Sequence, residues 1–394
     1  MKILHVFDFF SPHGGGTVEL LYKLTKAQAQ RGHEVSIYTS DFKLDLDYIT
    51  SLPEVNIYPF HCVSSLGLFY ITPSLVKAAR ENLKDFDVIH LHCVRSFQNI
   101  VIRRYALKYG VPYVLDQHGS LPRLVAGETG CKWLLRWLFD VVFGNLIARN
   151  AVKVLAQNDF AAREYKKFGV EDERIAIIPL FFPVEDYAEL PTHGEFRKRY
   201  GIVGKRIIMS FGRINKIKGL DFLVESFYEL SRSREDIILA IVGPDDGYQG
   251  RLRELIGKLN LGDRVLFTGF LSGQEKLAAL VDADVVVQPS RYEQAAWAPV
   301  EAVLCGTPVI VSNNTGSGED ISRMDAGYLV NYGDKNQMVN VIQSIIDDPT
   351  QAKAKVKRAK GYIINNLRVS DKVGDYERLY QQCIESNVPF RRGK

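Results

Sequence analysis

Short runs of apolar, mostly β-branched residues alternate along this chain with longer stretches whose apolar residues recur at helical spacing. Near-continuous apolar strands separated by helices are typical of parallel sheets that are covered on both faces. The pattern therefore predicts an α/β protein built from two doubly wound halves. The predicted strands span 2–7, 34–38, 88–92 and 113–116 in the first half, and 206–210, 237–242, 265–267, 284–288 and 309–312 in the second.

A charged stretch between Pro183 and Gly204 interrupts this pattern and predicts the boundary between the two halves. We expect a first domain over 1–190 and a second over 191–369. The tail beyond about Val369 has the apolar spacing of one further helix.

Length and composition agree with this division, because 394 residues suffice for two domains and a hydrophobic fraction of 46% suffices for two cores. A net charge of +4 is too small to indicate nucleic-acid binding. The five cysteines are scattered, with no CxxC pair or His cluster, so we expect reduced cytosolic thiols and no metal site. We find no signal-peptide pattern and no apolar run of transmembrane length, which favours a cytoplasmic protein.

Two glutamates, eight positions apart, follow the predicted strand at 284–288. Glu293 lies on the loop at the carboxyl end of that strand, and Glu301 lies on the helix that follows. These are usual places for ligand-facing groups in an open α/β sheet. Carboxylates accept hydrogen bonds from pairs of hydroxyls, which sugar nucleotides carry. Two glutamates at this spacing also occur by chance, so the interpretation depends on their neighbours.

A basic loop follows the predicted strand at 206–210. Gly212 and Arg213 come directly after the strand, and Lys218 precedes a helical pattern that starts at Leu220. Two fixed cations on a strand-to-helix loop suit a diphosphate, with Arg as a planar fork and Lys as a point charge. A solvated basic turn is the alternative interpretation.

The first half has a glycine-rich turn, Gly14 to Gly16, between its first predicted strand and a helical pattern. Glycines let backbone N–H groups approach an anion, and a helix N-terminus adds a favourable partial charge. The spacing is not the dinucleotide-binding GxGxxG, and a plain loop fits it equally well.

His118 follows the predicted strand at 113–116 and precedes a glycine. A lone histidine is usually a structural residue, but this one comes at the carboxyl end of a strand, where ligands bind. His90 and His92 flank a core strand, and we expect them to be structural.

In chain order, Gly212-Arg213, Lys218-Gly219, Val242-Gly243-Pro244, Phe267-Thr-Gly269 and the Glu293/Glu301 pair resemble the retaining glycosyltransferases of family 4. The likeness spans nearly the whole chain, and the set is specific although no single member is. It implies the GT-B fold, with two Rossmann-like domains and the donor site in the cleft between them. It also implies that the C-terminal helix, 370–394, packs back on the first domain.

The resemblance also implies a role for each matched residue. Arg213 and Lys218 would grip the donor diphosphate, Glu293 would hold sugar hydroxyls and Glu301 ribose hydroxyls. His118 would bond the donor sugar. The implied site has catalytic Arg213, Lys218, Glu293 and His118, donor-binding Gly14, Gly15, Gly16, Gly212, Gly243, Phe270, Ala295, Ala296, Trp297 and Glu301, and no metal ligand. Ala295-Ala296-Trp297 stands where the family usually has Phe-Gly and an aliphatic residue, which leaves the donor sugar open.

The chemistry implied is sugar transfer from a UDP- or GDP-linked donor to a hydroxyl acceptor with retention of anomeric configuration and no cofactor. The leaving phosphate would take the acceptor proton, and Arg213 and Lys218 would stabilise its charge. A double displacement with Glu293 as nucleophile is the less favoured path. Two other functions fit the same donor site, a sugar-nucleotide 2-epimerase and a non-catalytic sugar-nucleotide-binding protein.

The stretch 132–149 combines Trp133 and Trp137 with Lys132 and Arg136 at helical spacing. Aromatic residues beside basic ones suit contact with an anionic membrane, which would fit a glycan or lipid-linked acceptor at the inner face of the cell membrane. The alternative is a buried packing helix of the first domain. We expect nucleotide sugar and acceptor as partners, and no nucleic acid.

Overall fold

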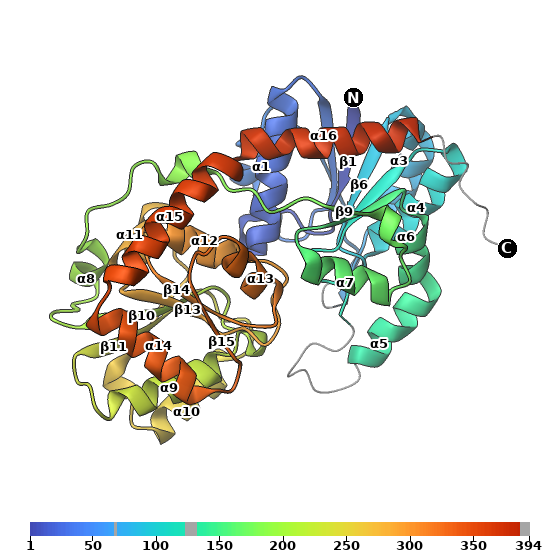
Figure 1. The fold of residues 1–394 in the computed structure, drawn as a ribbon. Coiled ribbons are helices and arrows are strands. Elements are labelled where there is room, and N and C mark those ends of the chain that lie inside the picture. Colours follow the sequence, from blue (N-terminus) through green and yellow to red (C-terminus); the bar gives the residue numbers. More distant parts are fainter. Residues whose placement is uncertain (67–68, 123–131, 387–394) are drawn as a thin grey trace. The chain divides into compact units, whose positions relative to one another are not determined.

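The computed structural model describes residues 1–66, 69–122 and 132–386. Within these residues the chain forms two compact units, one from 1–122, 132–181 and 369–386, and one from 182–368. Each unit is an open parallel sheet with helices on both faces (Figure 1). The predicted α/β class with two doubly wound domains is confirmed.

The first unit has a seven-stranded parallel sheet in the order β3-β2-β1-β6-β7-β8-β9. Its strands are β1 (Lys2–Val6), β2 (Glu34–Ser40), β3 (Asn56–Phe60), β6 (Val88–His92), β7 (Tyr113–Asp116), β8 (Lys153–Ala156) and β9 (Ile175–Ile177), with a separate hairpin of β4 (Ser64–Leu66) and β5 (Phe69–Ile71). Its helices are α1 (Gly16–Gln30), α2 (Leu46–Thr50), α3 (Ser74–Asn82), α4 (Phe97–Tyr109), α5 (Lys132–Phe139), α6 (Asn145–Asn150), α7 (Asp159–Lys167) and α16 (Val369–Glu385), with a π-helical turn at Asp140–Gly144.

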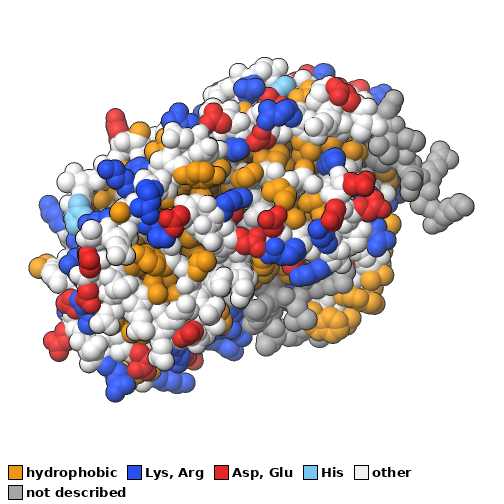
Figure 2. All heavy atoms as spheres, viewed as in Figure 1, with side chains coloured by type: hydrophobic (Ala, Val, Ile, Leu, Met, Phe, Trp, Pro, Cys, Tyr) orange, Lys and Arg blue, Asp and Glu red, His pale blue; other side chains and the backbone are white. Residues whose placement is uncertain are grey.

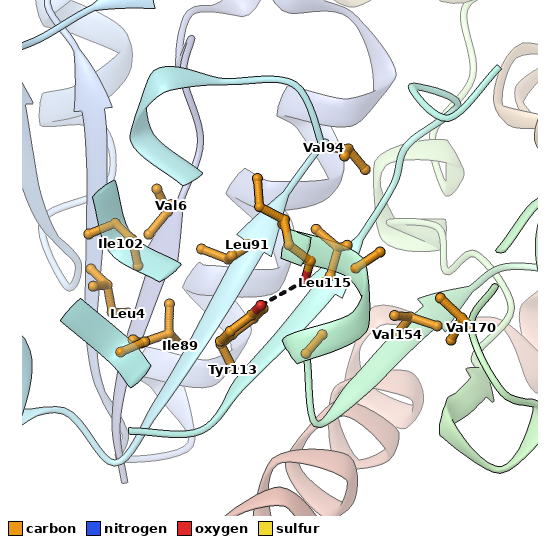
Figure 3. Packing of buried hydrophobic residues seen from close by; sticks show 14 of the residues in the cluster. Leu4, Val6, Ile89, Leu91, Val94, Ile102, Tyr113, Leu115, Val154 and Val170 are labelled. Carbon is orange, nitrogen blue, oxygen red and sulfur yellow. Dashed lines mark hydrogen bonds between the residues drawn. The ribbon is translucent and has the colours of Figure 1, made fainter. Parts of the chain in front are cut away.

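Alternate residues of the central strands point to opposite faces of this sheet. On one face Leu4, Ile89 and Leu91 share a core with side chains of α3 and α4. Figure 3 shows these three strand residues side by side within that core. The hydroxyl of buried Tyr113 donates to the Ile147 carbonyl at 2.6 Å, so this large polar side chain is satisfied inside the core. The other face is covered by α1 and α16.

The second unit has a six-stranded parallel sheet in the order β12-β11-β10-β13-β14-β15. Its strands are β10 (Arg206–Phe211), β11 (Ile237–Val242), β12 (Val265–Gly269), β13 (Val285–Gln288), β14 (Val309–Ser312) and β15 (Tyr328–Val330). Its helices are α8 (Glu195–Arg199), α9 (Leu220–Ser231), α10 (Gln249–Lys258), α11 (Gly273–Asp282), α12 (Trp297–Leu304), α13 (Gly316–Arg323), α14 (Lys335–Asp347) and α15 (Thr350–Asn366). The α9, α10 and α14 helices share one core with the sheet, and α12 packs on β13, β14 and α15.

The chain passes from the first unit to the second between Phe181 and Phe182, nine residues before the predicted boundary at 190/191. Phe182 belongs to the second unit because its N–H donates to the Leu367 carbonyl at 2.8 Å. Tyr187 belongs there too, since its hydroxyl bonds Glu301. The chain returns at Val369, where α16 begins and packs on α1.

The stretch 132–149 is largely exposed, although Asp140, Ile147 and Ala148 within it are buried. Nine large apolar side chains on α5, the π-helical turn after it and the start of α6 are between 36% and 66% exposed: Trp133, Leu134, Leu135, Trp137, Leu138, Val141, Val142, Phe143 and Leu146. We call these nine residues the α5 patch. Figure 2 shows hydrophobic side chains gathered at the place of α5, at the lower right of the view. The Lys132 side chain lies outside the described residues, and no described helix is long and apolar enough to cross a membrane.

Candidate active site

Two glycines bring the loops after β10, β11 and β13 into backbone contact. A Cβ on Gly243 would lie 2.0 Å from the carbonyl oxygen of Gly212, and a Cβ on Gly219 would lie 2.0 Å from that of Pro289. Both residues also have positive φ, at 142° and 65°, which L side chains rarely adopt. Glycine at these positions therefore lets the three loops form one surface at the carboxyl edge of the sheet.

Arg213 stands on this surface and is 57% exposed. Its guanidinium lies 2.7 Å from Asp246 Oδ2, and the Asn215 amide donates to the same oxygen at 3.0 Å. Asp246 thus holds an exposed cation at the end of β10. This carboxylate was not among the predicted site residues, although the sequence shows an acidic pair directly after Pro244.

Lys218 and Glu293 meet directly. Lys218 Nζ lies 2.5 Å from Glu293 Oε2, and both side chains are about one-fifth exposed, at 17% and 20%. The same oxygen accepts from Gln288 Nε2 and from Ser290 Oγ, both at 3.2 Å. The structure therefore brings together the lysine and the first glutamate that the sequence pattern singled out.

The loop that carries Glu293 is attached to the start of α13. The Glu293 carbonyl accepts from the Gly316 N–H at 2.8 Å, and the Ala296 N–H donates to Asp320 at 3.2 Å. Ala296 is buried, and the Trp297 ring lies 5.1 Å from the ring of Phe182. Trp297 consequently packs within the second unit, whereas Phe270, after β12, is 53% exposed.

Glu301 is 4% exposed and sits on α12. Its Oε1 accepts from the Tyr187 hydroxyl at 2.7 Å and from Lys276 Nζ at 2.8 Å. Burial and the Glu301 carboxylate raise the pKa of Tyr187, so this phenol stays a donor. Sequence reasoning missed both partners because they lie 114 and 25 residues away from Glu301. Glu301 thus also ties α12 to the segment that enters the second unit.

The glycine-rich turn of the first unit leads into α1. Gly14 ends a short 3-10 turn, Gly15 is the N-cap residue with φ of 73°, and Gly16 is the first residue of the 15-residue helix. The turn follows β1, so it lies on the carboxyl edge of the first sheet, together with the loop after β7 that carries His118.

His118 is held inside the first unit, with its side chain 6% exposed. Its Nε2 lies 2.8 Å from His92 Nδ1, and its Nδ1 lies 3.6 Å from Asp116 Oδ1. Gln157 donates to both oxygens of Asp116, at 2.9 and 2.8 Å. Burial lowers the pKa of His118 and raises the pKa of Asp116, because each charged form is desolvated.

A histidine cluster that the sequence analysis did not predict lies on the same face as α1 and α16. Ring nitrogens of His5, His90 and His92 lie within 4.8 Å of one another. His5 and His92 are 87 positions apart in the chain, and the three residues meet only because β1 pairs with β6. Spacing along the sequence carries no signal for such a pairing.

Two family descriptions match this chain, and together they cover most of it. Glycosyltransferase Family 4 matches residues 14–186, and Glycosyl transferases group 1 matches residues 193–362. The two parallel sheets, each covered by helices on both faces, form the GT-B fold of these proteins. The chain belongs to the family 4 type of glycosyltransferases.

Relatives and solved structures agree with that assignment. The chain is 22% identical over 373 residues to a GDP-mannose-dependent α-(1-6)-phosphatidylinositol dimannoside mannosyltransferase of Mycobacterium tuberculosis, with 94% of each chain covered. It is 28% identical over 316 residues to a 2-deoxystreptamine glucosyltransferase of Streptomyces kanamyceticus, covering 74% of this chain and 78% of the relative. The structure of Anabaena HepE in complex with UDP and glucose superposes with a TM-score of 0.79 at 20% identity, covering 97% of this chain and all of HepE.

Proposed function

We propose that this glycosyltransferase moves a hexose from a UDP- or GDP-linked donor to a hydroxyl acceptor, with retention of anomeric configuration and without a metal ion. The observation that carries the proposal is the contact of Lys218 with Glu293 on the loop surface that also bears Arg213. Cations suited to a diphosphate and a carboxylate suited to sugar hydroxyls stand side by side there.

Each cation has a carboxylate partner that a diphosphate would replace. Arg213 is paired with Asp246, and Lys218 with Glu293. The donor diphosphate would take over both cations and release the Glu293 carboxylate to accept from sugar hydroxyls. Exchange of one anion for another keeps the local charge balanced, which limits the electrostatic cost of opening the site.

The two cations would then stabilise the negative charge that develops on the leaving phosphate. Its oxygen would take the acceptor proton on the same face of the sugar, so the new bond replaces the old one with retention. Glu301, on its second carboxylate oxygen, would hold the ribose hydroxyls while Oε1 keeps Tyr187 and Lys276. His118 and the Gly14–Gly16 turn would contact the sugar and the diphosphate.

The proposed donor base and the proposed acceptor are taken from what the relatives bind. A mycobacterial relative is GDP-mannose-dependent and acts on a phosphatidylinositol dimannoside, and HepE was solved with UDP and glucose. A lipid-linked or surface-glycan acceptor fits the α5 patch, because contiguous exposed apolar surface marks interaction sites. We therefore propose peripheral attachment through the α5 patch, on the cytoplasmic side of an anionic membrane.

The test is a transfer assay with UDP- and GDP-linked hexoses, with and without a lipid extract as acceptor, read by mass spectrometry. Acceptor-dependent release of the nucleotide diphosphate, unchanged by EDTA, supports the proposal. A changed donor sugar in the absence of acceptor would identify an epimerase instead. Donor binding without turnover on any acceptor would identify a non-catalytic binding protein.

A further inference from the structure

Three buried imidazoles form a hydrogen-bonded row that ends at His118. His5 Nδ1 lies 2.9 Å from His92 Nε2, and His92 Nδ1 lies 2.8 Å from His118 Nε2. The planes of neighbouring rings differ by only 19° and 12°. The ring centroids lie 5.2 and 5.1 Å apart, far enough that the bonded nitrogens lie nearly on the line between them. Each contact therefore runs close to the ring planes, where the N–H bonds and lone pairs of imidazole lie.

The row begins at a side chain that fixes its direction. Gln28 presents Oε1 to His5 Nε2 at 2.8 Å, and its amide nitrogen donates to the Tyr380 hydroxyl at 3.4 Å. An amide oxygen only accepts, so His5 carries its hydrogen on Nε2. The α16 helix, through Tyr380, thus takes part in orienting the row.

Each neutral imidazole carries one N–H hydrogen, so the position of the hydrogen on His5 fixes the tautomers of His92 and His118. Burial lowers the pKa of His5 to about 4 and the pKa values of His92 and His118 in the same direction, so the three rings are neutral near pH 7. With His5 protonated on Nε2, its Nδ1 accepts from His92 Nε2. By the same step His92 Nδ1 accepts from His118 Nε2.

We propose that His92, His5 and Gln28 are positioning residues that hold His118 as its Nε2–H tautomer, so that Nδ1 is a hydrogen-bond acceptor for a donor-sugar hydroxyl. The Nδ1 atom lies 3.6 Å from Asp116 Oδ1, beyond hydrogen-bond distance, which leaves its lone pair for such a donor. The proposal rests on the proposed function in one respect, the contact of His118 with the sugar.

A metal ion is the competing use of these rings, because nitrogens of His5, His90 and His92 lie close together. An ion bound between His5 Nδ1 and His92 Nε2 would need a lone pair on both, whereas their 2.9 Å contact holds a hydrogen. The His90 and His92 rings are stacked, with centroids 4.1 Å apart and an angle of 25°. Stacked rings do not direct their lone pairs at one ion, so the hydrogen-bonded row is the better account.

The direct test is nitrogen NMR of the ligand-free protein labelled in its histidines, because protonated and unprotonated ring nitrogens resonate apart. The His118 signals are assigned by their loss in His118→Asn. We expect a protonated Nε2 and an unprotonated Nδ1 at pH 7.5. A protonated Nδ1, or signals moved by added Zn²⁺, would overturn the proposal.

Two matched variants test the coupling. His92→Phe and His90→Phe each replace a fully buried imidazole of β6 with a phenyl ring, but only His92 belongs to the row. We expect His92→Phe to lose the single His118 tautomer and to lower kcat/KM about tenfold, the effect of roughly one hydrogen bond. His90→Phe should keep the tautomer, and a tautomer unchanged in His92→Phe would contradict the proposal.

The NMR readout needs no donor and no turnover. If the unsubstituted protein fails to transfer any sugar, the proposed function fails while the tautomer result still decides this inference. If transfer occurs and His118 is protonated on Nδ1, this inference alone fails.

Discussion

Lys218 Nζ lies 2.5 Å from Glu293 Oε2, although 75 residues separate them in the chain. The lysine follows β10 and the glutamate follows β13, and these two strands are neighbours in the second sheet. The protein therefore pairs two groups that, in the proposed function, a sugar-nucleotide donor would separate. Substitutions at the two positions should be non-additive, since residues in one ion pair act as a unit.

Removing either cation of the loop surface should reduce turnover without unfolding the protein. For Arg213→Ala or Lys218→Ala we expect a loss of roughly 100- to 1000-fold in kcat, the usual effect of removing one preorganised transition-state partner. Arg232→Ala is the matched control, because Arg232 is an exposed cation paired with Glu229 at the end of α9. Near-normal kcat in both loop variants would contradict their role.

Substitution of Glu293 and substitution of Glu301 should have different effects on nucleotide binding. Glu293→Gln should leave the affinity for a free nucleotide diphosphate near normal and impair transfer, whereas Glu301→Gln should weaken nucleotide binding itself. Because Glu301 also bonds Tyr187, Tyr187→Phe is the control that removes this bond and keeps the carboxylate. Calorimetry with nucleotide alone measures the contrast, and the reverse order of affinities would show that the roles are assigned wrongly.

Acid should destabilise the first unit through its buried histidines. Burial lowers the pKa of His5 to about 4, so between that pH and about 6.5 the unfolded chain binds a proton that the folded chain excludes. Stability from His5 is complete above pH 6.5 and falls by about 2 kcal/mol at pH 5. Burial also lowers the pKa values of His90, His92 and His118, so their contributions to stability fall with pH in the same direction. Burial raises the pKa of Asp8 to about 7, so its contribution to stability changes with pH in the opposite direction.

Melting curves at pH 7.5 and 5.0 test this, with His5→Phe as the comparison. The parent protein should melt lower at pH 5.0, and the difference between the two pH values should shrink in His5→Phe. A parent protein that melts at the same or a higher temperature at pH 5.0 would refute this account of the cluster.

The α5 patch should bind anionic liposomes. Leu135→Asp and Leu138→Asp should reduce co-sedimentation, because they add charge to the surface proposed to enter the membrane. They should leave the melting temperature unchanged because both side chains are exposed. Leu46→Asp is the matched control, since Leu46 on α2 is as exposed as Leu135, at 66%. No sedimentation of the parent protein at any salt concentration would end the membrane proposal.

The sequence predicted the central strands well because they are buried on both faces and therefore apolar throughout. All nine predicted strands are present, within a few residues of their ends. It missed β3, β9 and β15 because these edge strands are short or half exposed and lack a continuous apolar run. It also missed β8, an interior strand of only four residues that begins with a lysine. The hairpin of β4 and β5 was missed for the same reason.

The candidate site divides in the same way. Residues next to strand ends, such as Arg213, Lys218 and Glu293, could be singled out from the sequence because parallel topology brings such positions to one edge. Partners such as Asp246, Lys276 and Tyr187 depend on side-chain contacts that no local pattern encodes. The row from His5 to His118 depends on strand pairing across 87 positions and was likewise invisible in the sequence.

The most direct measurement of the central claim is the melting temperature of the protein against a panel of nucleotide diphosphates and their sugars. A ligand that binds only the folded state raises the melting temperature. We predict a clear rise with one UDP- or GDP-linked hexose, and loss of that rise in the Arg213→Ala/Lys218→Ala double variant. No rise with any UDP- or GDP-linked sugar, or an equal rise in the double variant, would contradict the donor site described here.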